Sequence, residues 1–301
     1  MTSLPPQTLD DLQAAAEAEG LGTFWPRLAP YCRPSIRVSP ALAAAPLPLG
    51  ASRLGGVPDL PAAVGWPTWQ GRSLSFLVQL NLAELAIYPA AAVLPSAGWL
   101  SFFYDAQEQP WGYDPANRGR AVVQYHGPDA VLAPRLLPAD LSLEDYTAFP
   151  EVALSFAAEM TFPNPWEDEV GITEEELSEE QHEGYWRLLH RHGDGTSRLL
   201  GNPDVIQNPM RAQCALVTRG LYHGSTQGLQ ETQQKLGISD EQVEELKQAA
   251  TTEWELLLQL DSHEAEANMM WEDLGRLYFW IPREALAQRD FGAVWQVLQC
   301  F

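Results

Sequence analysis

Two stretches of this chain, about 145 residues apart, have nearly the same sequence. Residues 53–59 read RLGGVPD, and residues 198–204 read RLLGNPD. Each stretch is followed by two apolar blocks of strand length, FLVQLN and GWLSFFY after the first, LLLQLD and GRLYFWI after the second. Three blocks that recur in one order indicate an internal duplication. The repetition constrains the architecture strongly, but it names no chemistry.

The repeated blocks predict an α+β fold built from two related halves. Each half should hold a short, mostly antiparallel β-sheet, a pseudo-two-fold axis should relate the halves, and helices should lie on the periphery. We expect a single domain over residues 51–301. Its halves should span about 51–140 and 195–301, with an acidic connecting region at 141–194. The regular strand–helix alternation of a parallel sheet is not evident.

Residues 1–50 are expected to form an N-terminal helix and a wrapping segment outside this domain. Thr8 has the features of a helix N-cap, with Asp10 and Asp11 in the first turn. Residues 26–50 are rich in Pro and Ala and carry few charges. We therefore expect irregular chain wrapped over the surface there.

Local patterns in the middle of the chain predict further elements. Two β-branched and apolar runs, 121–125 and 130–137, flank a Gly-Pro-Asp turn and predict neighbouring strands. Thr173 followed by Glu176 forms a capping-box pattern, which predicts a helix running to about His190.

The charge balance is strongly acidic, with 18 basic residues, 40 acidic residues and a net charge of −22. Such a chain repels phosphate backbones and anionic lipid, so we expect it to bind neither nucleic acid nor membranes. Residues 140–194 alone hold 15 acidic residues and two arginines. This surplus is either a solvated surface or a surface shaped for a basic protein partner.

Four residues are candidates for such a partner surface. Trp111 lies between Pro110 and Gly112 in a predicted loop, and exposed tryptophans are frequent anchors of recognition. The other three candidates are the consecutive acids Glu174, Glu175 and Glu176.

Cysteine usage and hydropathy favour a cytoplasmic protein. The three cysteines are odd in number and widely spaced, which is typical of reduced thiols. No apolar run approaches the roughly 20 residues that span a bilayer, and the first residues lack the pattern of a signal peptide. A monomer is favoured, because duplication within one chain already supplies the symmetry of a dimer.

Several segments resemble the YwqG-like proteins, a bacterial family. They are SRLGGVPDLP at 52–61, FLVQLNLAEL at 76–85, LPSAGWLSFFY at 94–104, RLLGNPDVIQ at 198–207 and, most specifically, LLLQLDSHEAEANMMWEDLGRLYF at 256–279. The resemblance covers about residues 52–301 and implies a duplicated, mostly antiparallel α+β fold in a cytoplasmic protein. It carries no catalytic residues. Some relatives occur near toxin and immunity genes, which implies an inhibitory or partner-binding role.

Equivalent polar residues of the two copies are the first candidates for a ligand-binding cleft, because groups related by a two-fold axis often face each other between the halves. The candidates are Arg53, Asp59, Gln79, Asn81, Arg198, Asp204, Gln259, Asp261 and Asp273. A structural role is the alternative. An Arg and an Asp in one Gly-Pro turn can pair with each other, and a Gln inside an apolar strand can satisfy buried backbone groups.

The sequence predicts no metal, cofactor or catalytic residue. Asp261, Glu272 and Asp273 are close in sequence, but their spacing does not match a calcium-binding loop, and a hydrogen-bonded turn is the simpler interpretation. His182 and His190 do not share a helical face well. The chain has neither a nucleophile elbow nor a phosphate-binding Gly-Lys-Ser/Thr loop.

The sequence alone does not assign a function. The leading hypothesis is a non-enzymatic binding protein, immunity- or inhibitor-like, that recognises a basic protein partner. The competing hypothesis is an enzyme or small-molecule sensor that uses the cleft between the two halves.

Overall fold

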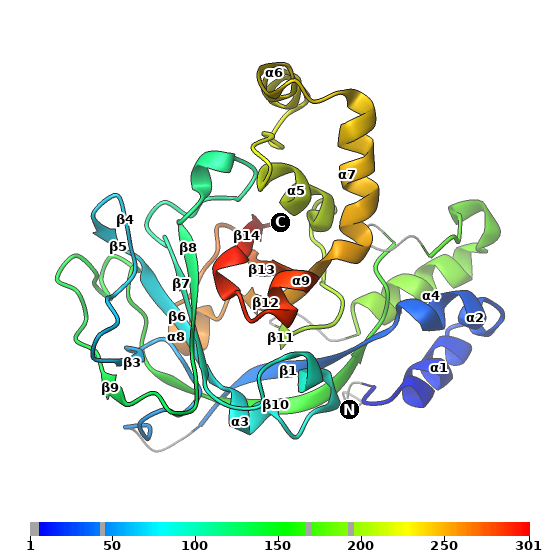
Figure 1. Ribbon diagram of the computed structural model, residues 1–301. Helices are drawn as coiled ribbons and strands as arrows, with labels where there is room; N and C mark the ends of the chain where they lie inside the picture. Colours follow the sequence, from blue (N-terminus) through cyan, green and yellow to red (C-terminus); the bar gives the residue numbers. More distant parts are fainter. Residues whose placement is uncertain (1–5, 43–45, 166–169, 192–195) are drawn as a thin grey trace.

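A ten-stranded, antiparallel β-sheet organises the chain (Figure 1). The computed structural model describes residues 6–42, 46–165, 170–191 and 196–301. The strand order is β14 (Trp295–Gln299), β13 (Arg276–Pro282), β12 (Trp254–Asp261), β11 (Ser197–Leu199), β1 (Arg33–Ala41), β10 (Val152–Thr161), β2 (Arg53–Leu54), β6 (Ser75–Asn81), β7 (Trp99–Tyr104) and β8 (Ala121–His126).

The sheet curls until it is nearly closed, like a barrel (Figure 1). The ring of Phe102 on β7 lies 5.2 Å from that of Phe279 on β13, although the two strands are far apart in the sheet order. Trp271 packs edge-on against Tyr104 in the same interior. Burial of these aromatic and aliphatic side chains is the main stabilising term of the fold.

The α+β class that the sequence predicts is therefore confirmed, with a mostly antiparallel sheet. Nine α-helices lie among the described residues. They are α1 (Leu9–Ala18), α2 (Trp25–Leu28), α3 (Leu82–Leu85), α4 (Glu179–Leu189), α5 (Met210–Val217), α6 (Thr226–Leu236), α7 (Asp240–Glu253), α8 (Glu264–Ala267) and α9 (Arg283–Ala287). Short 3-10 turns are η1 (Gly22–Phe24), η2 (Ala29–Tyr31), η3 (Pro89–Val93), η4 (Pro115–Asn117), η5 (Glu174–Glu176) and η6 (Phe291–Ala293).

Two groups of helices pack outside the barrel. Helices α1, α2 and α4 form one group around a separate apolar cluster that includes Leu12, Leu28 and Leu188. Helix α5 packs over β12, β13 and β14 through Met210 and Cys214, and α6 and α7 stand out from the sheet beyond it (Figure 1).

The prediction of irregular chain at 26–50 is wrong for residues 33–41. These residues form β1, which lies in the middle of the sheet between β10 and β11. Its prolines obscured it in the sequence. Pro34 and Pro40 pair with β10, but β11 pairs only with residues 36–38, between the two prolines. Proline has no backbone N–H to donate. It therefore costs no hydrogen bond where its nitrogen faces an edge of the strand that has no neighbouring strand.

Two other local expectations need correction. The strands β8 and β9 (Leu132–Pro134) do not pair with each other, because β8 joins β7 and β9 joins β3 (Asp59–Pro61) in a small separate sheet. A second small sheet joins β4 (Thr68–Trp69) and β5 (Arg72–Ser73). The helix expected from Thr173 begins later, because the capping box that forms joins Ser178 and Gln181.

Candidate functional site

Arg53 is the first residue of β2, and its buried side chain bonds to the turn that follows this strand. Its Nη2 lies 2.7 Å from Asp59 Oδ2, and its Nη1 lies 2.9 Å from Glu151 Oε2. The guanidinium also donates to the backbone carbonyls of Val57 and Pro48. These bonds hold the turn against the start of β10.

Arg198 is the middle residue of β11 and is completely buried, with 0% of its side chain exposed. Its Nη1 lies 2.7 Å from Asp204 Oδ1, and its Nε lies 3.0 Å from Glu159 Oε2. Its Nη1 also donates to the carbonyl of Asn202, as Arg53 does to Val57. Burial opposes the charged form, but Asp204 and Glu159 outweigh it and raise the pKa of Arg198 above its usual value.

The two glutamines make the same bonds in the two places. Gln79 Oε1 accepts the N–H of Asp59, and its Nε2 donates to the carbonyl of Ala51. Gln259 Oε1 accepts the N–H of Asp204, and its Nε2 donates to the carbonyl of Thr196. Both glutamines thus satisfy buried backbone groups, as the structural alternative predicts.

The backbone at the two turns is also alike. Gly55 and Gly56 have φ angles of 64° and 70°, and the matching Leu200 and Gly201 have 61° and 78°. The hydroxyls of Ser52 and Ser197 accept the N–H groups of Asn81 and Asp261 at 2.9 Å in both places.

The remaining candidates for the ligand cleft are not brought together. Asn81 caps α3 through a bond from the N–H of Ala83. Asp261 is buried and pairs with Arg276 at 2.5 Å, and burial raises the pKa of Asp261 despite that partner. Asp273 is exposed, and its backbone carbonyl accepts the N–H of Phe301.

A buried serine–histidine pair, which the sequence did not indicate, lies beside Asp261. Ser197 Oγ is 2.8 Å from His263 Nε2, and His263 Nδ1 is 4.0 Å from Glu266 Oε2. The order of groups resembles a nucleophile, base and carboxylate. However, Ser197 is fully buried, and its oxygen already accepts the Asp261 N–H. Burial lowers the pKa of His263, so the ring is neutral near pH 7. This pair holds the strand ends and has no access to a substrate.

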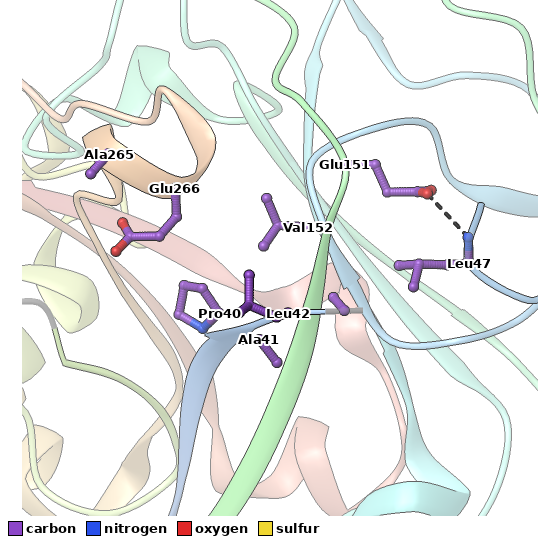
Figure 2. A pocket seen from close by; sticks show the side chains of 9 residues that line it. Pro40, Ala41, Leu42, Leu47, Glu151, Val152, Ala265 and Glu266 are labelled. Atoms are coloured by element: carbon purple, nitrogen blue, oxygen red, sulfur yellow. Dashed lines mark hydrogen bonds between the residues drawn. The ribbon is translucent and has the colours of Figure 1, made fainter. Parts of the chain in front are cut away.

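A pocket of about 550 Å³ opens where β1 ends and β10 begins, next to α8 (Figure 2). Its charged residues are Glu151 and Glu266, which lie on opposite sides of Val152 in Figure 2. The Glu151 carboxylate accepts the N–H of Leu47. The other lining side chains are apolar: Pro40, Ala41, Leu42, Leu47, Val152, Ala153 and Ala265. Two carboxylates above an apolar wall suit a cation with an aliphatic stem.

The candidates for the partner surface differ from one another. Trp111 is half-buried and packs against the main core. Glu175 is exposed, whereas Glu176 bonds to Arg27 at 2.6 Å, and this contact lowers the pKa of Glu176 to about 2. Glu174 belongs to the turn η5.

The described part of the chain contains no cluster of three His, Cys, Asp or Glu side chains placed to hold a metal ion. His190 stacks on the ring of Trp186, His182 contacts that ring edge-on, and His192 is outside the described residues. Cys32, Cys214 and Cys300, which all lie among the described residues, form no disulfide bond. None of the described helices has both the length and the apolar character that crossing a membrane requires.

The chain is thus an acidic α+β protein whose repeated polar residues are bonded mainly to one another. Residues 52–300 match the model of a family described as a domain of unknown function (DUF1963), and the chain belongs to that family. A comparison with curated proteins finds no match.

Proposed function

We propose that this chain is a non-enzymatic binding protein that recognises a basic protein partner. The observation that carries the proposal is the pocket between β1, β10 and α8, where the charged residues among the described lining residues are Glu266 and Glu151, the latter also paired with Arg53. A lysine or arginine of the partner would place its stem against Leu42, Leu47 and Val152 and its charge near Glu151 and Glu266. The net charge of −22 attracts such a partner from a distance.

The competing proposal, an enzyme or sensor that uses the paired polar residues, loses support from their bonding. Arg53 and Arg198 are each surrounded by two carboxylates and a backbone carbonyl. Their charges are balanced, and the two nitrogens that make no hydrogen bond among the described residues, Arg53 Nε and Arg198 Nη2, are buried away from solvent. Their role in the proposal is to hold the two turns that flank the central strands.

We also infer that the chain arose by duplication and that a pseudo-two-fold axis passes between Ser39 of β1 and Ser155 of β10, which pair in register. Outward from this pair, the strands run β11, β12, β13, β14 on one side and β2, β6, β7, β8 on the other. The matching bonds of the two turns support the inference. Membership of the YwqG-like proteins, a cytoplasmic location and a monomeric state belong to the same proposal.

The test uses Glu266, which is half exposed and lines the pocket. Wild-type protein, Glu266→Lys and Glu264→Lys are used to capture partners from a lysate of the source cells at low and high salt. Glu264→Lys is the matched control. Glu264 is exposed on the same helix but does not line the pocket, so this variant reverses the same charge outside the pocket. Binding to an oligolysine peptide is measured in parallel.

We expect a basic protein to be retained by wild type and by Glu264→Lys at low salt, and to be lost at high salt. Glu266→Lys should lose that protein and weaken binding of the peptide. Equal behaviour of the two variants would contradict the proposed pocket.

A further inference from the structure

A second pocket lies at the other end of the molecule, between α5, α6, α7, β14 and the loop at 111–113, with a volume of about 660 Å³. This volume is within the range of small-molecule sites, roughly 300–1,000 Å³. It is separate from the pocket of Figure 2 and shares no lining residue with it.

The lining of this second pocket reverses the charge of the molecule. None of the described residues that line it is acidic, in a chain with 40 acidic residues. It includes Lys247, one of only two lysines in the sequence, and His223. Burial and then the charge of Lys247 lower the pKa of His223, which indicates that the two side chains are close enough to interact.

The amino end of α6 also lines this pocket, through Gly224, Ser225 and Thr226. Helix α6 has 11 residues, and Ser225 caps it by accepting the N–H of Gly228. The first backbone N–H groups of a helix have no partner within the helix, and the helix dipole makes this end attractive to anions.

An independent observation points to a ligand in the same place. The Gln213 side chain lines the pocket and is 7% exposed, yet its Nε2 has no hydrogen-bond partner among the described residues. A buried amide without a partner costs free energy, so a hydrogen-bond acceptor on a ligand in this pocket would stabilise it.

The walls around this pocket are held firmly. Gln299 Oε1 accepts the N–H groups of Ile206 and Gln207, and its Nε2 donates to the carbonyl of Asn208. On the opposite side, the N–H of His223 donates to the carbonyl of Tyr113. A pre-formed wall reduces the entropy lost on binding.

We propose that this pocket binds a small organic anion, with its carboxylate or phosphate near Lys247 and the amino end of α6 and with a hydrogen-bond acceptor facing Gln213. Trp111 and Tyr113 supply an aromatic wall for the rest of the molecule. The anion site is independent of the partner pocket proposed above, so either can fail without the other.

The experiment measures thermal unfolding and calorimetric binding with three sets of probes: phosphate monoesters including nucleoside monophosphates, mono- and dicarboxylates, and neutral polyols. Probe concentrations up to about 10 mM detect dissociation constants near 1 mM. Stabilisation by only one of the first two sets identifies the anionic group. Stabilisation by both of these sets, without the polyols, supports a site for either anion.

Lys247→Gln and Gln213→Leu should each weaken the binding of an active probe by about tenfold or more, the loss expected for a bond to a charged group or a buried amide. Lys235→Gln is the matched control, because Lys235 is the other lysine, exposed in the last turn of α6 and away from the pocket. Gln213→Leu should fold normally, since it removes an unpaired buried amide.

Two results would overturn the proposal. One is the absence of any response to both anionic sets, or an equal response to the polyols. The other is binding that Lys247→Gln and Lys235→Gln weaken to the same extent, which would reflect net charge alone.

Discussion

The turns at Arg53 and Arg198 each pair a buried arginine with an aspartate, but the glutamate that completes each network lies at a different end of β10. Each arginine pairs with the aspartate six residues later and with a glutamate at or near β10. Glu151, the partner of Arg53, has 27% of its side chain exposed and lines a pocket. Glu159, the partner of Arg198, has 0% exposed. The glutamate is therefore the accessible carboxylate of the first network and the fully buried carboxylate of the second.

The cover around the two turns differs because different elements connect each turn to the next long strand. After the first turn, the chain makes the short strands β3, β4 and β5. After the second turn it makes the helices α5, α6 and α7, and α5 packs on the outer side of β12 to β14. The burial of Arg198 thus accompanies a thicker layer of helix over the second half.

The largest expected effect contrasts the two glutamates. Glu159→Gln should destabilise the protein by about 3–5 kcal/mol, because Arg198 and Glu159 are both fully buried and only the partly exposed Asp204 is left to balance the guanidinium. Glu151→Gln should cost less than about 1 kcal/mol, since solvent screens that pair and Asp59 still faces Arg53. Urea unfolding followed by tryptophan fluorescence measures both. Similar losses of stability in the two variants would mean that the burial of the glutamate does not determine how much each network stabilises the protein.

The next effect concerns the turn backbone, where Gly55 matches Leu200. A Cβ atom on Gly55 would lie 2.2 Å from the carbonyl oxygen of Pro150, and its φ is +64°. Gly55→Ala should therefore cost more than about 2 kcal/mol. Gly71→Ala is the control, because Gly71 also has a positive φ but nothing within 4 Å of its Cβ position. It should cost about 1 kcal/mol. Equal losses of stability in the two variants would show that the positive φ angle alone, without the clash with Pro150, accounts for the need for glycine at position 55.

A smaller effect is expected from His263, which bonds to Ser197. The matching Ser52 has no histidine among the bonds described above. The folded-state pKa of His263 is lowered, so the unfolded chain binds its proton first as the pH falls below about 6.5. Stability should decrease by about 1 kcal/mol between pH 7 and pH 5.5 through this residue. His126 and His223 add to the trend, because burial lowers their pKa values as well.

The variant His263→Gln keeps a hydrogen-bonding group near Ser197 and should flatten this pH dependence. His190→Gln, at an exposed site, should leave it unchanged. Thermal unfolding at several pH values distinguishes them. A slope that His263→Gln does not alter would contradict the neutral, buried imidazole.

The smallest effect is expected at the exposed pair of Arg27 and Glu176. Glu176→Gln should change Tm by less than about 2 °C at pH 7, because solvent screens surface ion pairs. The folded-state pKa of Glu176 is about 2, so the pair is intact above about pH 4.5 and weakens only as the pH falls toward 2. The small difference in Tm between wild type and Glu176→Gln should therefore be the same at pH 7 and pH 5. A difference that disappears by pH 5 would contradict the lowered pKa of Glu176.

The sequence predicted the strands of both halves well, because their apolar runs are continuous and their blocks are repeated. It missed β1, since Pro34 and Pro40 suggest irregular chain until the short length of β11 is known. Proline position relative to a partner strand is a tertiary property, and one sequence does not contain it.

The candidate sites show a similar limit. Repetition pointed to Arg53, Gln79, Arg198 and Gln259, whose side chains make matching bonds in the two turns, but it gave no measure of how fully they are bonded. The residues around the two pockets have no shared motif. Glu151 and Glu266 are more than 100 residues apart in the chain, and only the curled sheet brings them to one opening.

The position of β1 also affects which fragment of this chain can be expressed as a folded protein. The family match begins at residue 52, after β1 has ended at Ala41. A fragment expressed from residue 52 would leave β10 and β11 as two bare, facing strand edges in the middle of the sheet. Such edges promote aggregation. The stretch that the family model matches is therefore shorter than the unit that folds, and a truncated protein should begin before Arg33.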